Sequence, residues 1–137
     1  MIEFIDIDNA APYQKFEQLY QLALASSQEN IEAICVSSFD HTLNTTDSRF
    51  VNLKFVKQKE FIFFTNLHSP KAIQFEKNPN TSISIFWNKV NTQIRMKGKI
   101  QKTDDLFCDE YFSNRSWKKN ALAISSNQSN KINSFME

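Results

Sequence analysis

Glycine is almost absent from this chain of 137 residues, and Gly98 is its single example. Loops that wrap a nucleotide phosphate with backbone amides need several glycines, because the backbone must approach the phosphate closely and turn sharply. The scarcity of glycine therefore excludes those loops. Any phosphate that this chain binds has to be held by side chains, by ordinary backbone and by the start of a helix.

Cysteine and histidine are also rare. Cys35 and Cys108 indicate buried or free thiols in a reducing compartment. His41 and His68 complete no metal-ligand spacing with them, so we expect no metal site. Apolar runs stay far below the ~20 residues of a membrane span. The first residues, MIEFIDIDNAAPYQKF, are acidic early and lack the apolar core of a secretory signal, so we expect a cytoplasmic protein.

The chain also lacks an excess of either positive or negative charge. The net charge is +1, which gives no general attraction to nucleic acid or to an anionic membrane. A basic stripe at Arg95, Lys97 and Lys99 is more consistent with a solvated or dimer-facing strand than with a nucleic-acid site. We therefore expect neither nucleic acid nor membrane as a partner.

The chain is rich in hydrophobic residues, at 41%, and in phenylalanine, with 13. This composition and length predict one folded domain over 1–137. Within it, 1–30 is expected to be an N-terminal helical segment and 125–137 a polar tail.

Hydrophobic spacing and turn residues predict the elements. Helices are expected at Pro12–Ser27, at Ser69–Asn78, at Asp104–Asn114 and, as a short piece, at Lys118–Ile124. Strands are expected at Ile31–Phe39, Arg49–Val56, Glu60–Thr65, Thr81–Trp87 and Gln93–Ile100, with a polar turn at Asp40–Ser48. Several connections are too short for parallel crossovers. The pattern therefore predicts a mainly β fold with flanking helices, arranged as a small antiparallel barrel.

Short motifs then follow one another in a recognisable order. They are Arg49-Phe-Val-Asn-Leu-Lys54, Phe63-Phe64-Thr65-Asn66, Ser69-Pro70-Lys71, Asn78-Pro79, Phe86-Trp87, Gln93-Ile94-Arg95, Gly98, Tyr111-Phe112-Ser-Asn-Arg115 and Ser126-Asn-Gln128-Ser129. Each is weak alone, but their order and spacing over roughly 31–132 resemble the pyridoxamine 5′-phosphate oxidase family. That resemblance implies an FMN-binding split β-barrel that works as a homodimer with FMN at the interface.

The resemblance also implies roles for individual residues. FMN contacts are expected from one set, with Gln93 reaching the cofactor of the other subunit: Arg49, Phe50, Val51, Lys54, Phe64, Thr65, Lys71, Gln93, Gln128 and Ser129. The phosphate of a small phosphorylated substrate is expected at Lys54, Tyr111 and Arg115. No catalytic side chain is required, because the flavin carries the redox chemistry.

The activity implied is an FMN-dependent oxidoreductase that passes a hydride from a small substrate, such as a B6 phosphate, to FMN. Three departures affect this expectation: Pro70 replaces a basic residue, Lys119 replaces a serine, and the family's C-terminal substrate segment is absent from these 137 residues. A flavin reductase-type enzyme with another small substrate is a related possibility. The alternative from another class is a flavin-binding protein or degenerate paralogue without oxidase turnover.

One geometric question stays open. Arg49 and Lys54 are five residues apart, so a regular strand directs them to opposite faces. Either a β-bulge lies between them, or one of them serves the site of a neighbouring subunit.

Overall fold

The computed structural model describes residues 1–66, 68–103, 120–125 and 132–136. Two α-helices and one short 3-10 helix lie among the strands: α1 (Ala11–Ala25), α2 (Pro70–Lys77) and η1 (Asn88–Val90). The strands are β1 (Glu3–Ile5), β2 (Ala33–Asp40), β3 (Thr45–Lys57), β4 (Glu60–Thr65), β5 (Asn80–Trp87), β6 (Thr92–Lys102), β7 (Asn120–Ser125) and β8 (Ile132–Met136).

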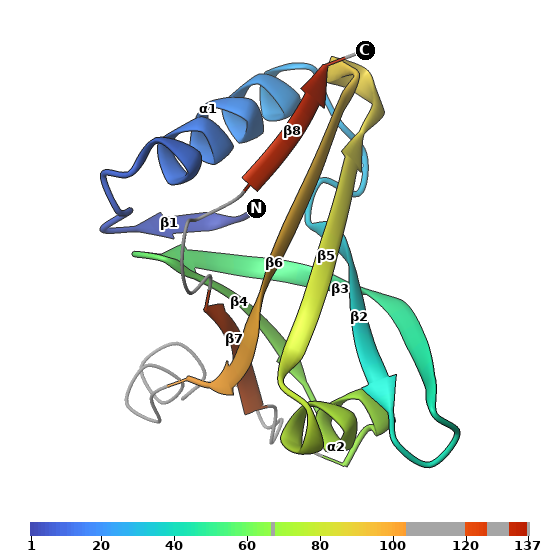
Figure 1. Cartoon of the computed structure of the whole chain (residues 1–137). Helices are drawn as coiled ribbons and strands as arrows, with labels where there is room; N and C mark the ends of the chain where they lie inside the picture. The colour runs from blue at the N-terminus through green and yellow to red at the C-terminus, as the bar shows by residue number, and fades with distance from the viewer. Residues whose placement is uncertain (67, 104–119, 126–131, 137) are drawn as a thin grey trace.

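Six strands form a closed ring. The order β3-β2-β5-β6-β7-β4 returns to its start because β3 also pairs with β4, and all of these pairs are antiparallel. β1 joins β3 as a parallel strand, and β8 pairs with β6 beyond the part that β7 uses. The predicted antiparallel barrel is therefore confirmed (Figure 1).

Tight turns are made without glycine. Within the described ranges, six residues other than glycine adopt positive φ, among them Asn44 before β3, Gln58 in the two-residue link from β3 to β4, and Asn91 before β6. Asparagine tolerates this left-handed region better than most residues. The β3–β4 hairpin predicted around Lys57-Gln58-Lys59 is confirmed.

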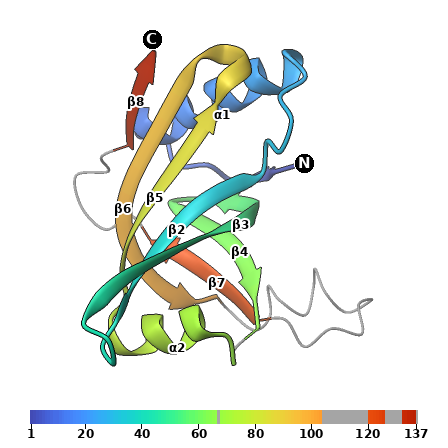
Figure 2. The same cartoon turned by 90° about the vertical axis from the view of Figure 1, so that its right-hand side faces the viewer.

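The two helices lie at opposite ends of the barrel (Figures 1 and 2). α1 covers one end with an apolar face made of Tyr13, Phe16, Leu19, Tyr20 and Ala23, all buried. The ring of Phe16 contacts Phe4, Phe61 and Trp87 at centroid distances of 5.1 to 6.1 Å. This aromatic cluster fills one mouth of the barrel and leaves the other to α2.

α2 begins as its sequence predicts. Ser69 is the N-cap and its hydroxyl accepts a hydrogen bond from the backbone N–H of Ala72, while Pro70 takes the first helical position. Ala72 and Phe75 are buried. No helix of the described residues is both long and apolar enough to cross a membrane.

The structure corrects three expectations. The predicted polar turn is shorter, because β3 already begins at Thr45 and pairs along β2 as far as Asp40. The short helix predicted at Lys118–Ile124 is wrong over its described part, where β7 pairs with both β4 and β6. Helix-forming Ala and Leu residues gave that prediction, and ladder formation between two neighbours overrides local propensity. β8 adds a strand within the stretch expected to be only a polar tail.

Replacing Phe16 by Ala should destabilise the protein by about 3–5 kcal/mol, because the ring is fully buried and its loss leaves a cavity. Urea unfolding followed by circular dichroism measures the change. Leu22→Ala on the same helix is the control, since Leu22 is 55% exposed and should change stability by less than about 0.5 kcal/mol. Equal losses in both variants would show that the aromatic cluster does not organise this end of the barrel.

Candidate functional site

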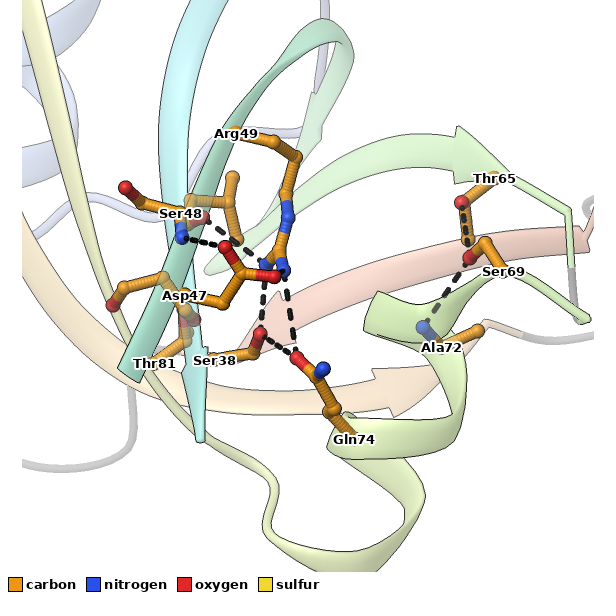
Figure 3. A network of polar contacts seen from close by, with 11 residues as sticks. Ser38, Asp47, Ser48, Arg49, Thr65, Ser69, Ala72, Gln74 and Thr81 are labelled. Atoms are coloured by element: carbon orange, nitrogen blue, oxygen red, sulfur yellow. Dashed lines mark hydrogen bonds and ion pairs between the residues drawn. The ribbon is translucent and has the colours of Figure 1, made fainter. Parts of the chain in front are cut away.

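The Arg49 guanidinium lies in a network that joins β2, β3 and α2 (Figure 3). It donates to the Ser38 hydroxyl at 2.8 Å, to the Val36 carbonyl at 3.3 Å and to the Gln74 side-chain oxygen at 3.4 Å. Ser38 and Gln74 are also bonded to each other. Asp47 forms an ion pair with Arg49 at 3.1 Å, but the Asp47 side chain is 55% exposed. These contacts fix the guanidinium toward α2.

The start of α2 lies against the end of β4. The hydroxyls of Thr65 and Ser69 are 3.3 Å apart, and Thr65 is buried. Pro70 has no N–H, and Ser69 already accepts from Ala72. The first-turn donor without an acceptor among the described residues is therefore the backbone N–H of Lys71.

Lys71 lies close enough to Arg49 for the two charges to interact. Burial lowers the pKa of the Lys71 ammonium below its usual value of 10.5, and the Arg49 charge lowers it further. The Lys71 side chain makes no ion pair with a described residue. Folding therefore places two cations near enough to interact, and Asp47, an exposed carboxylate, is the one acidic partner that they have in the part of the chain that the structure describes.

This arrangement can hold an anion. Two cations, the Thr65 hydroxyl and a backbone N–H at a helix start are the donors that phosphate needs. An anion placed between Arg49 and Lys71 would relieve their repulsion. Of the residues predicted to hold FMN, the structure brings Arg49, Thr65 and Lys71 to this end of the barrel.

Lys54 lies elsewhere. The β3–β4 register shifts between Leu53 and Phe55, so Lys54 occupies a β-bulge, which is one of the two answers left open by the sequence. Its ammonium is 2.7 Å from the Glu32 carboxylate, and the side chains are 39% and 23% exposed. Arg49 and Lys54 thus have separate partners, and the described contacts do not join them in one site.

The remaining described residues of the predicted FMN set differ in their exposure and in their neighbours. Phe50 is 74% exposed on the face of β3 opposite Arg49, whereas Val51 packs against the core. Phe64 packs edge-on against Phe55. Gln93 pairs with Phe86 across β5 and β6.

Four predicted residues, Tyr111, Arg115, Gln128 and Ser129, lie outside the described residues, as do Lys119 and the predicted helix Asp104–Asn114. Their predicted roles in FMN and substrate binding stay predictions.

Sequence reasoning missed four residues that hold the predicted cations. Ser38 had a signal, since it continues the buried alternation of Ile34 and Val36 with a polar side chain. Gln74 had a weaker one, three positions after Lys71 on the same helix. Asp47 had one too, since it lies two positions before Arg49 on the same face of β3. Glu32 had none, because its pairing with Lys54 depends on which residues of two segments lie opposite each other.

A separate cavity of about 640 Å³ lies beside α2 and contains none of the predicted site residues; its described lining is His68, Ala72, Ile73, Phe75, Glu76, Pro79, Ile100, Gln101 and Lys102. The described residues include no group of three or more His, Cys, Asp or Glu side chains arranged to hold a metal. Among the described residues, the hydrogen-bond donors around Arg49 and Lys71 therefore form the best-supported candidate for a binding site.

Replacing Lys71 by Met should leave the ligand-free protein as stable as the unmodified chain or more stable at pH 7. The lowered pKa means that the Lys71 charge opposes folding, and that this penalty disappears only as the pH rises through the lowered pKa toward 10.5. Urea unfolding without phosphate in the buffer checks this, with Lys15→Met as the exposed control. A loss above about 1 kcal/mol, the scale of an average destabilising substitution, would contradict an uncompensated charge at Lys71.

The sequence matches a known family. The pattern that defines the family described as pyridoxamine 5′-phosphate oxidase matches residues 23–136. The pyridoxine/pyridoxamine 5′-phosphate oxidase of Legionella pneumophila (strain Paris) is 34% identical over 121 residues, which cover 88% of this chain and 56% of that protein. The enzyme of the same name from Actinobacillus pleuropneumoniae serotype 5b is 33% identical over 129 residues, covering 94% and 61%. This chain therefore spans little more than half the length of these curated relatives.

Solved structures share the fold. A pyridoxamine 5′-phosphate oxidase-related, FMN-binding protein from Nostoc punctiforme matches with a TM-score of 0.69 at 13% identity, covering 93% of this chain and 97% of that one. PhzG from Burkholderia lata 383, in complex with tetrahydrophenazine-1-carboxylic acid, matches with a TM-score of 0.70 at 17% identity, covering 77% and 52%. The structural likeness establishes the split barrel, and the sequence matches show that the chain belongs to the pyridoxamine 5′-phosphate oxidase family.

Proposed function

We propose that this chain binds FMN and acts as an FMN-dependent oxidoreductase on a small substrate. The observation that carries the proposal is the pair Arg49 and Lys71, two cations held near each other at the start of α2 with Lys71 unpaired among the described residues. Family membership supplies the candidate anion, which is the phosphate of FMN.

The residues present fit that phosphate. Arg49 is fixed by Ser38 and Gln74, so little of its freedom would be lost on binding. Lys71 would contribute both its ammonium and its backbone N–H, and the Thr65 hydroxyl lies at the adjoining strand end. Bound flavin supplies the two-electron redox chemistry, and the protein binds and orients it.

A homodimer accounts for the position of Gln93. Phe86 and Gln93 are directly paired, and both side chains face away from the barrel core. Lys99, at the α2 end of the same strand, is six residues from Gln93, a separation of about 20 Å along a strand. This distance makes it difficult for Gln93 and Lys71 of one chain to contact the same ligand. Gln93 of a second chain is not held at this distance from Lys71.

The outer face of the sheet supports such a dimer. Phe50 and Phe86 are 74% and 59% exposed. Register places Phe50 opposite Cys35, and Cys35 opposite Ser84, two residues before Phe86. Both rings therefore project from one face of the sheet, and Gln93 lies on that face as well.

A second candidate is a flavin-binding protein without oxidase turnover. The observation that favours it is the ion pair between Lys54 and Glu32, because Lys54 was predicted to hold the phosphate of the substrate. Flavin binding is common to both candidates. Product formation with FMN bound separates them.

Titration with FMN tests the proposal. The protein should bind FMN with a perturbed flavin absorption spectrum, and Arg49→Met or Lys71→Met should each weaken binding by roughly 10- to 100-fold, the scale of a lost hydrogen bond to a charged group. Flavin fluorescence gives the dissociation constants. Lys15→Met is the control and should bind as the unmodified chain does. Unchanged affinity in both site variants would sink the assignment of Arg49 and Lys71 to the phosphate.

Light scattering tests the dimer. Phe86→Asp should convert a dimer to a monomer, because the change places a charge in the middle of a buried apolar contact. Leu22→Asp introduces the same charge at an exposed position on α1 and should leave the dimer intact. A monomeric unmodified chain, or a Phe86→Asp dimer, would refute the proposed interface.

A further inference from the structure

Lys54 is engaged by a carboxylate of its own chain. The Lys54 Nζ to Glu32 Oε1 distance is 2.7 Å, a strong charge-assisted hydrogen bond. Glu32 Oε2 also accepts from the amino group of Met1 at 3.4 Å. The Glu32 side chain is 23% exposed, so water screens this pair less than a fully solvated one.

The backbone holds the two partners together. The N–H of Leu53 donates to the Glu32 carbonyl at 2.8 Å, so the residue before Lys54 is bonded to the residue that pairs with it. The β-bulge at Lys54 lies at the same point of β3. The ion pair is therefore set by the pairing of β3 with the residues leading into β2, and not by chance contact of two mobile side chains.

Glu32 remains ionised at neutral pH. Burial acts to raise the pKa of its carboxyl, but the hydrogen bond and charge of Lys54, together with the Met1 amino group, outweigh burial and lower the pKa below 4.5. A phosphate that approaches Lys54 would therefore meet a carboxylate that repels it and already occupies the ammonium.

The two cations predicted on β3 thus differ. Asp47, the carboxylate beside Arg49, is 55% exposed, and Arg49 lies near a second cation, Lys71. Glu32 is more buried, and among the described residues no second side-chain cation lies beside it. The part of β3 that bears Arg49 therefore has an excess of positive charge that can attract an anion. The side-chain charges of Lys54 and Glu32, by contrast, cancel.

We propose that Glu32 is a specificity-determining residue, because its ion pair with Lys54 prevents Lys54 from binding a phosphate. The part of the substrate that contacts Lys54 is then an uncharged polar group. A hydroxyl or amide can donate to Glu32 or accept from Lys54 without breaking the ion pair. This inference rests on the proposed function, because Lys54 bears on substrate choice only if the chain has the family's substrate site.

The test compares two probes that differ by one phosphate, pyridoxine and pyridoxine 5′-phosphate, by anaerobic titration calorimetry on FMN-saturated protein. The unmodified chain gives the reference preference, to which the predicted phosphate contacts of Tyr111 and Arg115 would contribute in every variant. Glu32→Gln should raise the preference for the phosphorylated probe at least tenfold, since a hydrogen bond between charged groups becomes available. Glu32→Gln combined with Lys54→Met should lose that gain.

Two further variants make the result specific. Glu29→Gln changes the net charge equally at an exposed residue three positions away and should leave the preference unchanged. Lys54→Met alone should lower the preference, because it leaves the Glu32 carboxylate without the charge that cancels it; this arm does not depend on the folding of a Glu32 variant.

An unchanged phosphate preference in Glu32→Gln, or an equal response to Glu32→Gln and Glu29→Gln, would overturn the inference. Failure of both probes to bind any variant would overturn it as well. Failure of the proposed function is seen separately, as absence of flavin binding in the FMN titration that precedes these measurements.

Discussion

The burial of the Lys71 ammonium near a second cation, Arg49, is the constraint on which the proposed function depends. A cation in a partly desolvated position costs free energy, and more beside a like charge; among the described residues only the exposed Asp47 carboxylate offsets this cost. Three strands and a helix are nevertheless arranged so that the two charges lie near enough to interact. An arrangement that costs stability without a ligand, and recovers it with an anion, is typical of a binding site.

The barrel explains how this cost is tolerated. The aromatic cluster under α1 fills one end and supplies buried area far from the cations. Ring closure through β3 and β4 then fixes the strand that bears Arg49 beside the strand end that bears Thr65. α2 begins at that strand end, with Ser69 as its cap, and this brings Lys71 to the site. The residues that stabilise the barrel at α1 and the residues proposed to bind an anion at α2 thus lie at opposite ends of the fold.

The sequence predicted the parts of this site that depend on local chemistry. Ser69-Pro70 marks a helix start by its own capping chemistry, and alternation of apolar residues marks β5 and β6. It did not predict that Asn120–Ser125 is a strand, because the partners that stabilise β7 lie far away in the chain. For the same reason the Glu32–Lys54 pair was missed: cross-strand ion pairs follow from register, which no single segment specifies.

The family resemblance placed Arg49, Lys54 and Lys71 together as binders of anions, and the structure separates them. Arg49 and Lys71 share surplus positive charge, whereas Lys54 is paired with Glu32. Membership of a family therefore indicates the fold more securely than it indicates the role of each cation. The roles depend on which carboxylates this chain has placed nearby.

Calorimetric comparison of FMN with riboflavin is the most direct test, because the two ligands differ only by the phosphate. If Arg49 and Lys71 form the phosphate site, FMN should bind at least tenfold more tightly than riboflavin, and most of that difference should vanish in Lys71→Met. Equal affinity for the two flavins, or a difference that survives in Lys71→Met, would contradict the account.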